Sequence, residues 1–269
     1  MTQSQDPSCF AAVDETSDPR FFIEFLDARK TIEGEREVKE LILRLLALHE
    51  GDSVLDVGCG TGDDAREIAG LVGRKGRVVG IDPSEVMIAE SRRRAEGSGL
   101  PVHFQRGDAR KMDFPDASFD RVHTDRVLMF VPEMEQALSE IRRVLRPGGL
   151  LVTSELDHGL HYTDSVHHDT TAKIYAAFAE AQPQPRLGRG LARLLHQAGF
   201  QSVKSMPMVL RPPYKTFRRL FDGFLRSAIQ RARLSEAEVT AWLNSLEQAD
   251  ADGVFQNGVV VFTIVGQKP

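Results

Sequence analysis

Cysteine is scarce in this chain: Cys9 and Cys59 are the only two among 269 residues. They stand alone, without the paired spacing of a zinc site or a disulfide framework. We therefore expect no bound metal and a reduced, cytoplasmic protein. The first ten residues, MTQSQDPSCF, hold no apolar segment and so do not suggest a secretory signal.

Long apolar runs and an excess of one charge are missing as well. The longest clean apolar stretch, residues 259–265, is too short to cross a bilayer and predicts a buried strand. The formal net charge is −5 and the isoelectric point about 5.9, so the composition favours neither nucleic acid nor a membrane as partner. With 41% hydrophobic and 27% charged residues, the chain resembles an ordinary globular protein.

What the sequence does contain is a regular alternation of strand-like and helix-like segments. Short β-rich runs alternate with amphipathic stretches along much of the chain. Such alternation is typical of a parallel sheet covered by helices on both faces. We expect strands at residues 53–57, 77–81, 102–105, 119–124, 150–155, 203–209 and 254–265, and helices at residues 63–72, 84–96, 132–145 and 187–198.

The N-terminal part precedes this alternation. Loose order is expected up to about Asp18, and two helices with apolar faces are expected at residues 21–30 and 35–49. The first of them is explained equally well as a core helix or as a segment folded over a ligand. We assign residues 1–34 to an N-terminal lid segment.

The alternation of strand-like and helix-like segments ends after Glu155. The following residues are rich in histidine, and two further helices are predicted between residues 214 and 249. We interpret two regions, at about 156–185 and 211–250, as helical cap insertions over the ligand edge of the sheet. The main domain would then comprise residues 35–269.

The segment VLDVGCGTG carries three glycines at alternate positions, Gly58, Gly60 and Gly62, directly after a predicted strand. Glycines let the backbone approach a ligand, and the start of the next helix offers free N–H groups, as in nucleotide sites of doubly wound sheets. In the dinucleotide fingerprint the third glycine comes one residue later. Asp63 occupies that position here and would repel a pyrophosphate. A tight turn without a ligand is the plain alternative.

A carboxylate follows each of the next two predicted strands. Asp82 comes 20 residues after Gly62, where a carboxylate can accept both hydroxyls of a ribose. Asp108, in a Gly-Asp turn, is suited to accept from an adenine amino group. Taken singly, Asp82 is also explained as a helix cap and Asp108 as a turn residue. Together with the glycines, they favour a ligand with a nucleoside and no pyrophosphate.

Four segments in this order, VLDVGCGTG, GIDPSEVMIAESRRRA, GDARKMDFPDASFDRV and RVLRPGGLLV, resemble the class I S-adenosylmethionine-dependent methyltransferases. The likeness covers about residues 50–155, and GRGLARLLHQAGF (188–200) extends it. Within the class, the chain is similar to small-molecule enzymes of quinone biosynthesis and natural-product pathways. The resemblance implies a Rossmann-like, doubly wound α/β fold with a mostly parallel seven-stranded sheet, S-adenosyl-L-methionine as cofactor and a small-molecule substrate.

The resemblance also implies which residues hold the cofactor. The three glycines would line its methionine part, with Asp56 anchoring the loop or the methionine amine. The second carboxylate would hold the ribose, Met87 would pack near the adenine, and the backbone of Thr124 would face the methionine. The expected cofactor-binding residues are Asp56, Gly58, Cys59, Gly60, Gly62, Asp82, Pro83, Met87, Gly107, Asp108, Ala109 and Thr124.

The sequence offers several candidates for the catalytic residue. Many members of the class place a histidine after the fourth strand, where this chain has Phe130. Residues after the fifth strand are alternatives, since histidine or a carboxylate can accept a proton near neutral pH; we name Asp157, His161 and Tyr162 as candidates. An acidic phenol, an N–H heterocycle or a stabilised carbanion would need no base. Cys59 is explained as a small turn residue.

Substrate contacts are expected from both cap regions and the N-terminal segment. The candidates are Phe25, Arg29, Phe130, His158 and Phe217, although simple packing in a helix core explains Phe25, Arg29 and Phe217 equally well.

The sequence thus predicts S-adenosylmethionine-dependent methyl transfer to an O, N or C nucleophile of a small molecule, in secondary metabolism, by a monomer or homodimer. One alternative is a protein of the same fold that keeps the cofactor but catalyses a different step, which the missing histidine at Phe130 makes conceivable. Another is an RNA methyltransferase, suggested by the basic stretch Arg211–Arg233. Few aromatic residues accompany that stretch, and a solvated helix face explains it better.

Overall fold

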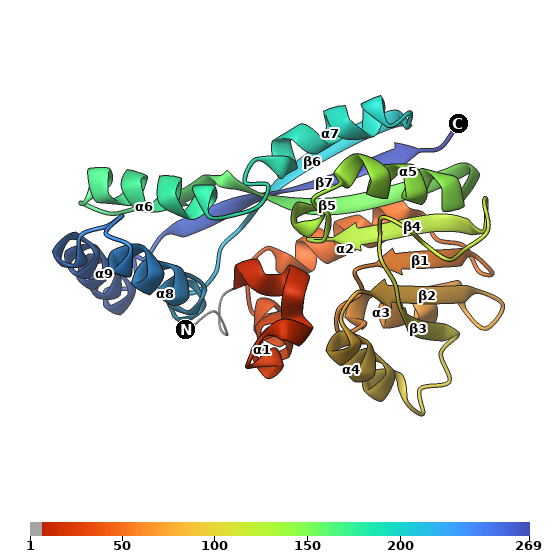
Figure 1. Cartoon of the computed structure of the whole chain (residues 1–269), viewed down its shortest axis with the longest axis horizontal. Helices are drawn as coiled ribbons and strands as arrows, with labels where there is room; N and C mark the ends of the chain where they lie inside the picture. The colour runs from red at the N-terminus through yellow and green to blue at the C-terminus, as the bar shows by residue number, and fades with distance from the viewer. Residues whose placement is uncertain (1–6) are drawn as a thin grey trace.

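A seven-stranded sheet forms the centre of the computed structural model, which describes residues 7–269 (Figure 1). The strand order is β3-β2-β1-β4-β5-β7-β6, and β7 runs antiparallel to both of its neighbours, as expected for the mostly parallel, doubly wound sheet. The strands are β1 (Ser53–Val57), β2 (Arg77–Asp82), β3 (Val102–Arg106), β4 (Phe119–Asp125), β5 (Leu145–Thr163), β6 (Gln201–Leu210) and β7 (Asn257–Gln267).

Helices cover both faces of the sheet. Because successive side chains of a strand point to opposite faces, Val54 packs under one helical layer and Leu55 under the other. The first layer contains α2 (Glu35–Leu46), α3 (Asp63–Val72) and α4 (Glu85–Ala95); the second contains α5 (Met134–Val144) and α7 (Leu187–Gln197). The helix α5 begins two residues later than predicted, so Pro132 precedes it and Glu133 is its N-cap.

The strand predicted at residues 150–155 is much longer in the structure. β5 pairs with β7 as far as Thr163, so residues 156–163 continue the sheet. The β6 strand also pairs with β7 along most of this extension, as far as Leu210. The extension meets α6 (His168–Glu180), α8 (Tyr214–Gln230) and α9 (Glu236–Ala251), which group at that end of the sheet (Figure 1). The three helices share a second apolar core around the fully buried Trp242. We call these three helices the cap.

The N-terminal segment is more ordered than its composition suggested. Residues Pro7–Glu15 form a 3-10 helix, η1, and α1 (Pro19–Arg29) follows it. The Asp14 carboxylate accepts hydrogen bonds from the Ser84 hydroxyl and, at 2.8 Å, from the backbone N–H of Glu85. These groups lie at the positive end of α4, so the contact ties η1 to the sheet. The first six residues of the stretch expected to be loose lie outside the described part.

Candidate active site

The glycine-rich loop after β1 is tied to the end of β2. The backbone N–H groups of Gly58 and Cys59 donate to the carbonyl of Ile81, at 2.7 and 3.0 Å, and the N–H of Gly60 donates to Asp82 Oδ2 at 3.0 Å. Gly58 has φ +72°, and a Cβ there would lie 2.3 Å from the side chain of Val127. This glycine is therefore required both by its backbone conformation and by the close approach of the segment after β4.

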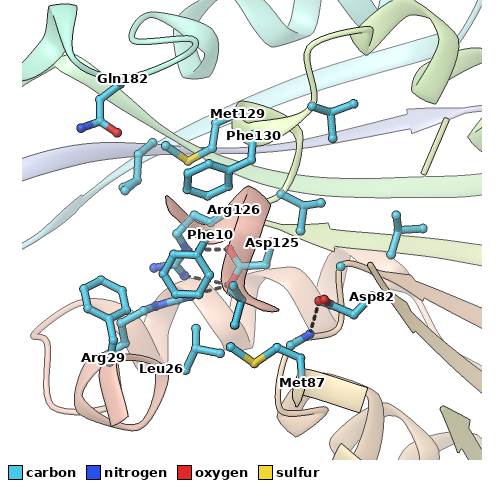
Figure 2. A pocket seen from close by; sticks show the side chains of 18 of the residues that line it. Phe10, Leu26, Arg29, Asp82, Met87, Asp125, Arg126, Met129, Phe130 and Gln182 are labelled. Atoms are coloured by element: carbon cyan, nitrogen blue, oxygen red, sulfur yellow. Dashed lines mark hydrogen bonds and ion pairs between the residues drawn. The ribbon is translucent and has the colours of Figure 1, made fainter. Parts of the chain in front are cut away.

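A cavity of about 460 Å³ opens where the parallel strands end (Figure 2). This is the edge at which doubly wound sheets bind ligands. Eight of the predicted cofactor residues line it: Gly58, Gly60, Asp82, Pro83, Met87, Gly107, Asp108 and Ala109.

Four other predicted cofactor residues do not line this cavity. Asp56 and Cys59 line a second cavity of about 450 Å³ behind the loop. Gly62 lines neither: it precedes α3 with φ +73°, and a Cβ there would lie 2.6 Å from the ring of Phe104. Thr124 is buried in β4 and donates a 2.8 Å hydrogen bond to Thr153, while its neighbour Asp125 lines both cavities.

Asp82 is the best-oriented polar group of the first cavity. Its Oδ2 accepts from Gly60 and its Oδ1 accepts from the N–H of Ser84 at 2.9 Å, which leaves lone pairs on both oxygens. Burial raises the pKa of Asp82 to about 6. At neutral pH the group is ionised and can accept two further hydroxyls.

Asp108 lies at the same edge but has a partner already. Its carboxylate receives a 2.7 Å hydrogen bond from Arg110, and this contact is the main reason why the pKa of Asp108 is lowered. Both side chains are more than one third exposed, so the pair is a weak clamp that a ligand can displace.

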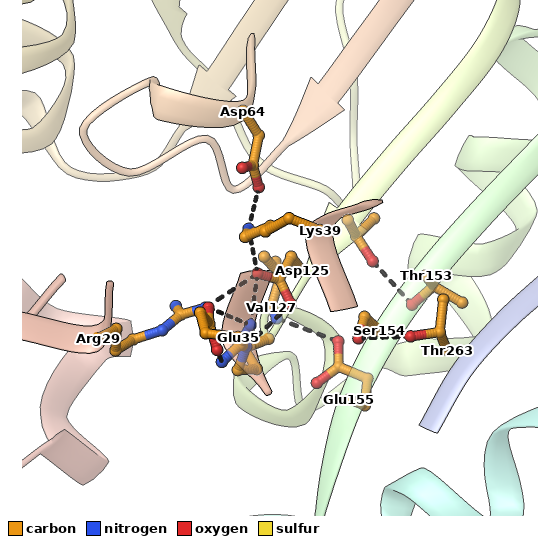
Figure 3. A network of polar contacts seen from close by, with 12 residues as sticks. Arg29, Glu35, Lys39, Asp64, Asp125, Val127, Thr153, Ser154, Glu155 and Thr263 are labelled. Atoms are coloured by element: carbon orange, nitrogen blue, oxygen red, sulfur yellow. Dashed lines mark hydrogen bonds and ion pairs between the residues drawn. The ribbon is translucent and has the colours of Figure 1, made fainter. Parts of the chain in front are cut away.

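A buried ionic network joins the N-terminal helices to the end of β4 (Figure 3). Arg126 donates to both oxygens of Glu35, at 2.8 and 2.9 Å, and Arg29 donates to Glu35 and Asp125, at 2.8 and 3.0 Å. Lys39 bridges Asp125, at 2.7 Å, and Asp64. Sequence reasoning named only Arg29 of this group. A glutamate at the first position of an apolar helix, and an Asp-Arg pair directly after a strand, were the available signals.

The second cavity contains a cluster of titratable groups. Asp56 is almost fully buried, its Oδ2 has no hydrogen-bond partner among the described residues, and burial raises its pKa to about 7. His123 Nε2 lies 3.2 Å from Asp64. Burial also raises the pKa of the Cys59 thiol, which therefore stays protonated and is a poor nucleophile, as expected from its position in the turn.

Glu155 organises the segment that follows β4. It lies on β5, is fully buried, and its Oε1 accepts from the backbone N–H groups of Val127 and Leu128, at 3.0 and 2.8 Å. This segment contains the short 3-10 helix η2 (Leu128–Phe130), which carries Phe130 into the cavity. Glu155 was missed because a glutamate at the end of a predicted strand resembles a surface residue.

The other half of the first cavity is lined mainly by apolar side chains, five of them phenylalanines. Phe10 and Phe25 come from the N-terminal segment, Phe130 from η2, and Phe178 and Phe221 from the cap. The rings of Phe10 and Phe130 pack against each other, with centroids 5.8 Å apart (Figure 2). This half suits an apolar molecule with rings.

Four of the five predicted substrate residues line this cavity, namely Phe25, Arg29, Phe130 and His158, and so does the catalytic candidate His161. Phe217 does not, because it packs against Trp242 in the core of the cap.

Two other catalytic candidates lie away from the cavity. Asp157 is fully buried and forms an ion pair with Arg189 of α7, at 2.5 Å. Burial alone would raise its pKa, but the hydrogen bonds from Arg189 hold the pKa below its usual value. Tyr162 is 43% exposed, and its ring covers Gly258 on β7. Neither residue is in a position to contact a ligand in this cavity.

The fold and the cavity define a nucleoside-binding α/β enzyme of the methyltransferase type, and comparison with known proteins shows the family. A family model described as a methyltransferase domain matches residues 48–199. The chain belongs to this family and is an S-adenosylmethionine-dependent methyltransferase. Among residues 7–269 no helix is long and apolar enough to cross a membrane, and no group of three or more His, Cys, Asp or Glu is placed to hold a metal ion.

Three curated relatives illustrate the similarity. An uncharacterized 37.1 kDa protein in transposon TN4556 of Streptomyces fradiae is 35% identical over 91% of this chain and 71% of its own length. The O-methyltransferase cnsE of Penicillium expansum is 33% identical over 68% of this chain, which spans just under two thirds, 65%, of the fungal protein. A demethylmenaquinone methyltransferase of Listeria monocytogenes is 33% identical over 60% of this chain and 75% of its own length.

Solved structures show the same fold. The [4+2]-cyclase SpnF superimposes with a TM-score of 0.58 at 24% sequence identity, over 87% of this chain and 82% of its own. A methyltransferase from Bacillus halodurans superimposes with a TM-score of 0.58 at 20% identity, over 86% and 98% of the two chains. These likenesses concern the architecture of the sheet and its helices.

Proposed function

We propose that this methyltransferase transfers the methyl group of S-adenosylmethionine to a nucleophilic atom of an apolar small molecule with rings, in secondary metabolism. The proposal rests on one observation: the first cavity has two chemically different halves. One half presents the glycine loop and Asp82, and the other presents the aromatic side chains described above. One relative is named an O-methyltransferase and another is named for the methylation of demethylmenaquinone, which agrees with this division.

The residues in the half of the cavity that contains the glycine loop and Asp82 fit the cofactor. Asp82 would hold the ribose hydroxyls, and Met87, which is 2% exposed and lines the cavity, would pack against the adenine. The methionine end of the cofactor carries one carboxylate and one ammonium group. Two buried atoms that have no partner among residues 7–269 match them: Nε of Arg29 for the carboxylate and Oδ2 of Asp56 for the ammonium. Arg29, Gly58 and Gly60 line both cavities.

The bound cofactor supplies an activated methyl group and a neutral leaving sulfide. The chain must orient the acceptor in line with that group and exclude water. Phe10, Phe25 and Phe130 come from two separate segments and close the cavity from the side of the N-terminal helices, while the cap closes the opposite side.

Three of the seven basic residues in the stretch Arg211–Arg233 have carboxylate partners, which weakens the case for an RNA substrate. Arg211 pairs with Glu33, Arg218 with Asp222 at 2.9 Å, and Arg219 with Glu24 at 3.2 Å. A partner carboxylate reduces the charge that each of these arginines offers to a phosphate. We further propose that the enzyme works in the cytoplasm as a monomer or homodimer, in agreement with the free, buried thiol of Cys59.

Two measurements test this function. Isothermal titration with S-adenosylhomocysteine should give saturable binding, and its absence at high micromolar concentration would contradict the proposal. Mass spectrometry of converted substrate should show the gain of one methylene unit, about 14 Da by elementary composition. A product isomer of unchanged mass would instead indicate a cofactor-retaining protein that catalyses another step.

A further inference from the structure

Two histidines that line the substrate half of the cavity form a linked pair. Nδ1 of His158 lies 3.2 Å from Nε2 of His161, within hydrogen-bonding distance. The rings are stacked, with centroids 5.5 Å apart, and Tyr175 stacks on the outer face of His161 at 5.2 Å. The edge of Phe178 contacts both rings, at 5.4 Å. The pair is therefore held rigidly by its aromatic surroundings.

One polar atom of this pair has no partner in the part of the chain that the structure describes. His158 is 6% exposed, and its Nε2 is buried without a hydrogen bond to any described residue. Leaving such an atom unpaired costs roughly 1–3 kcal/mol, so a buried ring nitrogen at the wall of a cavity indicates a ligand group. The ring cannot turn to relieve this, because Nδ1 is already bonded to His161.

The surroundings keep both imidazoles neutral. Burial lowers the pKa of His158 to about 4 and lowers the pKa of His161 well below its usual value. The nearest carboxylate, Asp157, bonds to Arg189 instead, and the cap contributes the apolar ring of Phe221, 5.9 Å from His161. In a linked pair of neutral imidazoles one inner nitrogen donates and the other accepts. When His158 donates through Nδ1, its Nε2 carries a free lone pair.

We propose that His158 Nε2 accepts a hydrogen bond from the hydroxyl group that is methylated, so that the substrates are ring compounds with an acidic hydroxyl, such as phenols, hydroquinones or enols. This rests on the proposed function and narrows it to O-methylation. His158 contacts the substrate, and His161 positions it through the Nδ1–Nε2 contact.

The proton balance of the reaction follows from this arrangement. As the hydroxyl oxygen bonds to the methyl carbon and the sulfur–methyl bond breaks, the O–H proton passes to Nε2 of His158. His158 then carries the positive charge of the former sulfonium, with its Nδ1 proton still donated to Nε2 of His161, and it releases the proton to water as the product leaves. A weakly basic imidazole suffices, because an oxygen that is being alkylated becomes strongly acidic, and a neutral ring does not repel the sulfonium before transfer.

The test compares a ligand with and without the hydroxyl. The full chain, free of cofactor, is titrated with 1-naphthol and with naphthalene. Wild type should bind 1-naphthol more tightly by about three- to tenfold, the range expected for one buried hydrogen bond. In His158→Phe, which keeps the ring volume, the preference should fall to within about twofold. His158→Gln should retain part of it, and His168→Phe, at an exposed position at the start of α6, should retain all of it.

A second measurement does not depend on a variant. In wild-type protein with ¹⁵N-labelled histidine, 1-naphthol should shift the Nε2 resonance of His158 and naphthalene should not. The proposal is wrong if wild type shows no preference for the hydroxyl, if the preference survives in His158→Phe, or if the Nε2 resonance does not respond. These outcomes are independent of S-adenosylhomocysteine binding, so failure here can be told apart from failure of the proposed function.

Discussion

The carboxylate of Glu155 on β5 accepts a 2.8 Å hydrogen bond from the backbone N–H of Leu128, the first residue of the 3-10 helix η2. The same oxygen accepts from Val127 at 3.0 Å. Burial raises the pKa of Glu155 to about 8, so the group is mostly protonated at neutral pH, with one oxygen free to accept from two backbone donors. A residue that does not itself line the cavity thus sets the path of the segment that brings Phe130 into it.

Two replacements of Glu155, by Ala and by Gln, distinguish the stability that comes from its hydrogen bonds from the effect of its charge. Glu155→Ala leaves the N–H groups of Val127, Leu128 and Met129 without this acceptor and should lower the free energy of unfolding by about 2–4 kcal/mol. At about pH 5, where the folded wild type holds the proton, Glu155→Gln keeps an accepting oxygen and should stay within about 1 kcal/mol of wild type. Urea denaturation at this pH measures both values, and equal losses in the two variants would argue against this role.

The stability of wild type relative to Glu155→Gln should also depend on pH. The carboxyl has a higher pKa in the folded state, about 8, than in the unfolded chain, so the folded state holds its proton longer. The contribution of this proton to stability is present at low pH and is lost as the pH rises toward 8. Glu155→Gln should therefore gain stability over wild type between about pH 5 and 8. A constant difference across this range would contradict the assigned shift.

Asp82 should dominate the affinity for the cofactor. Asp82→Ala removes a charged acceptor of two ribose hydroxyls, and S-adenosylhomocysteine binding should weaken about ten- to hundredfold. The exposed Asp164 offers a matched control, and Asp164→Ala should bind like wild type. Calorimetric titration of the folded variants decides the point. An unchanged dissociation constant in Asp82→Ala would mean that this residue only orders the loop.

The same residue predicts how cofactor binding depends on pH. Burial raises the pKa of Asp82 to about 6, and the ionised form is the one that accepts both hydroxyls. Affinity for S-adenosylhomocysteine should therefore fall as the pH drops through 6, in addition to a first decline near pH 7 from protonation of Asp56, whose pKa burial raises to about 7. Titration from pH 5 to 8 should show that Asp82→Asn loses the decline through pH 6 and keeps the one near pH 7.

Asp157 should act on stability alone. Its carboxylate joins β5 to α7 through Arg189, and it also accepts from the N–H of Gly159 at 3.0 Å. Asp157→Ala should lower the free energy of unfolding by about 1–3 kcal/mol. Binding of S-adenosylhomocysteine should stay within about twofold, which is roughly 0.4 kcal/mol. A large loss of cofactor affinity at unchanged stability would place Asp157 in the site after all.

Local sequence was sufficient for the elements whose structure depends on near neighbours. The strand at residues 53–57 and the helix at 63–72 agree with the prediction, since apolar periodicity acts within a few residues. The glycine loop and Asp82 also come together as expected, because the ends of adjacent parallel strands must meet at one edge of the sheet.

Only the tertiary structure decided which polar residues face the cavity. Asp157, His158, His161 and Tyr162 lie close together in the sequence, yet only the two histidines line the cavity. Pairing with β7 extends β5 through these residues, and a shift in register between Asp157 and His161 decides which side chains turn toward the cap. Arg189 on α7, which is 32 residues further along the chain, then forms an ion pair with Asp157. These contacts join distant segments, so the sequence determined the cofactor loop, whereas packing between segments decided the substrate wall.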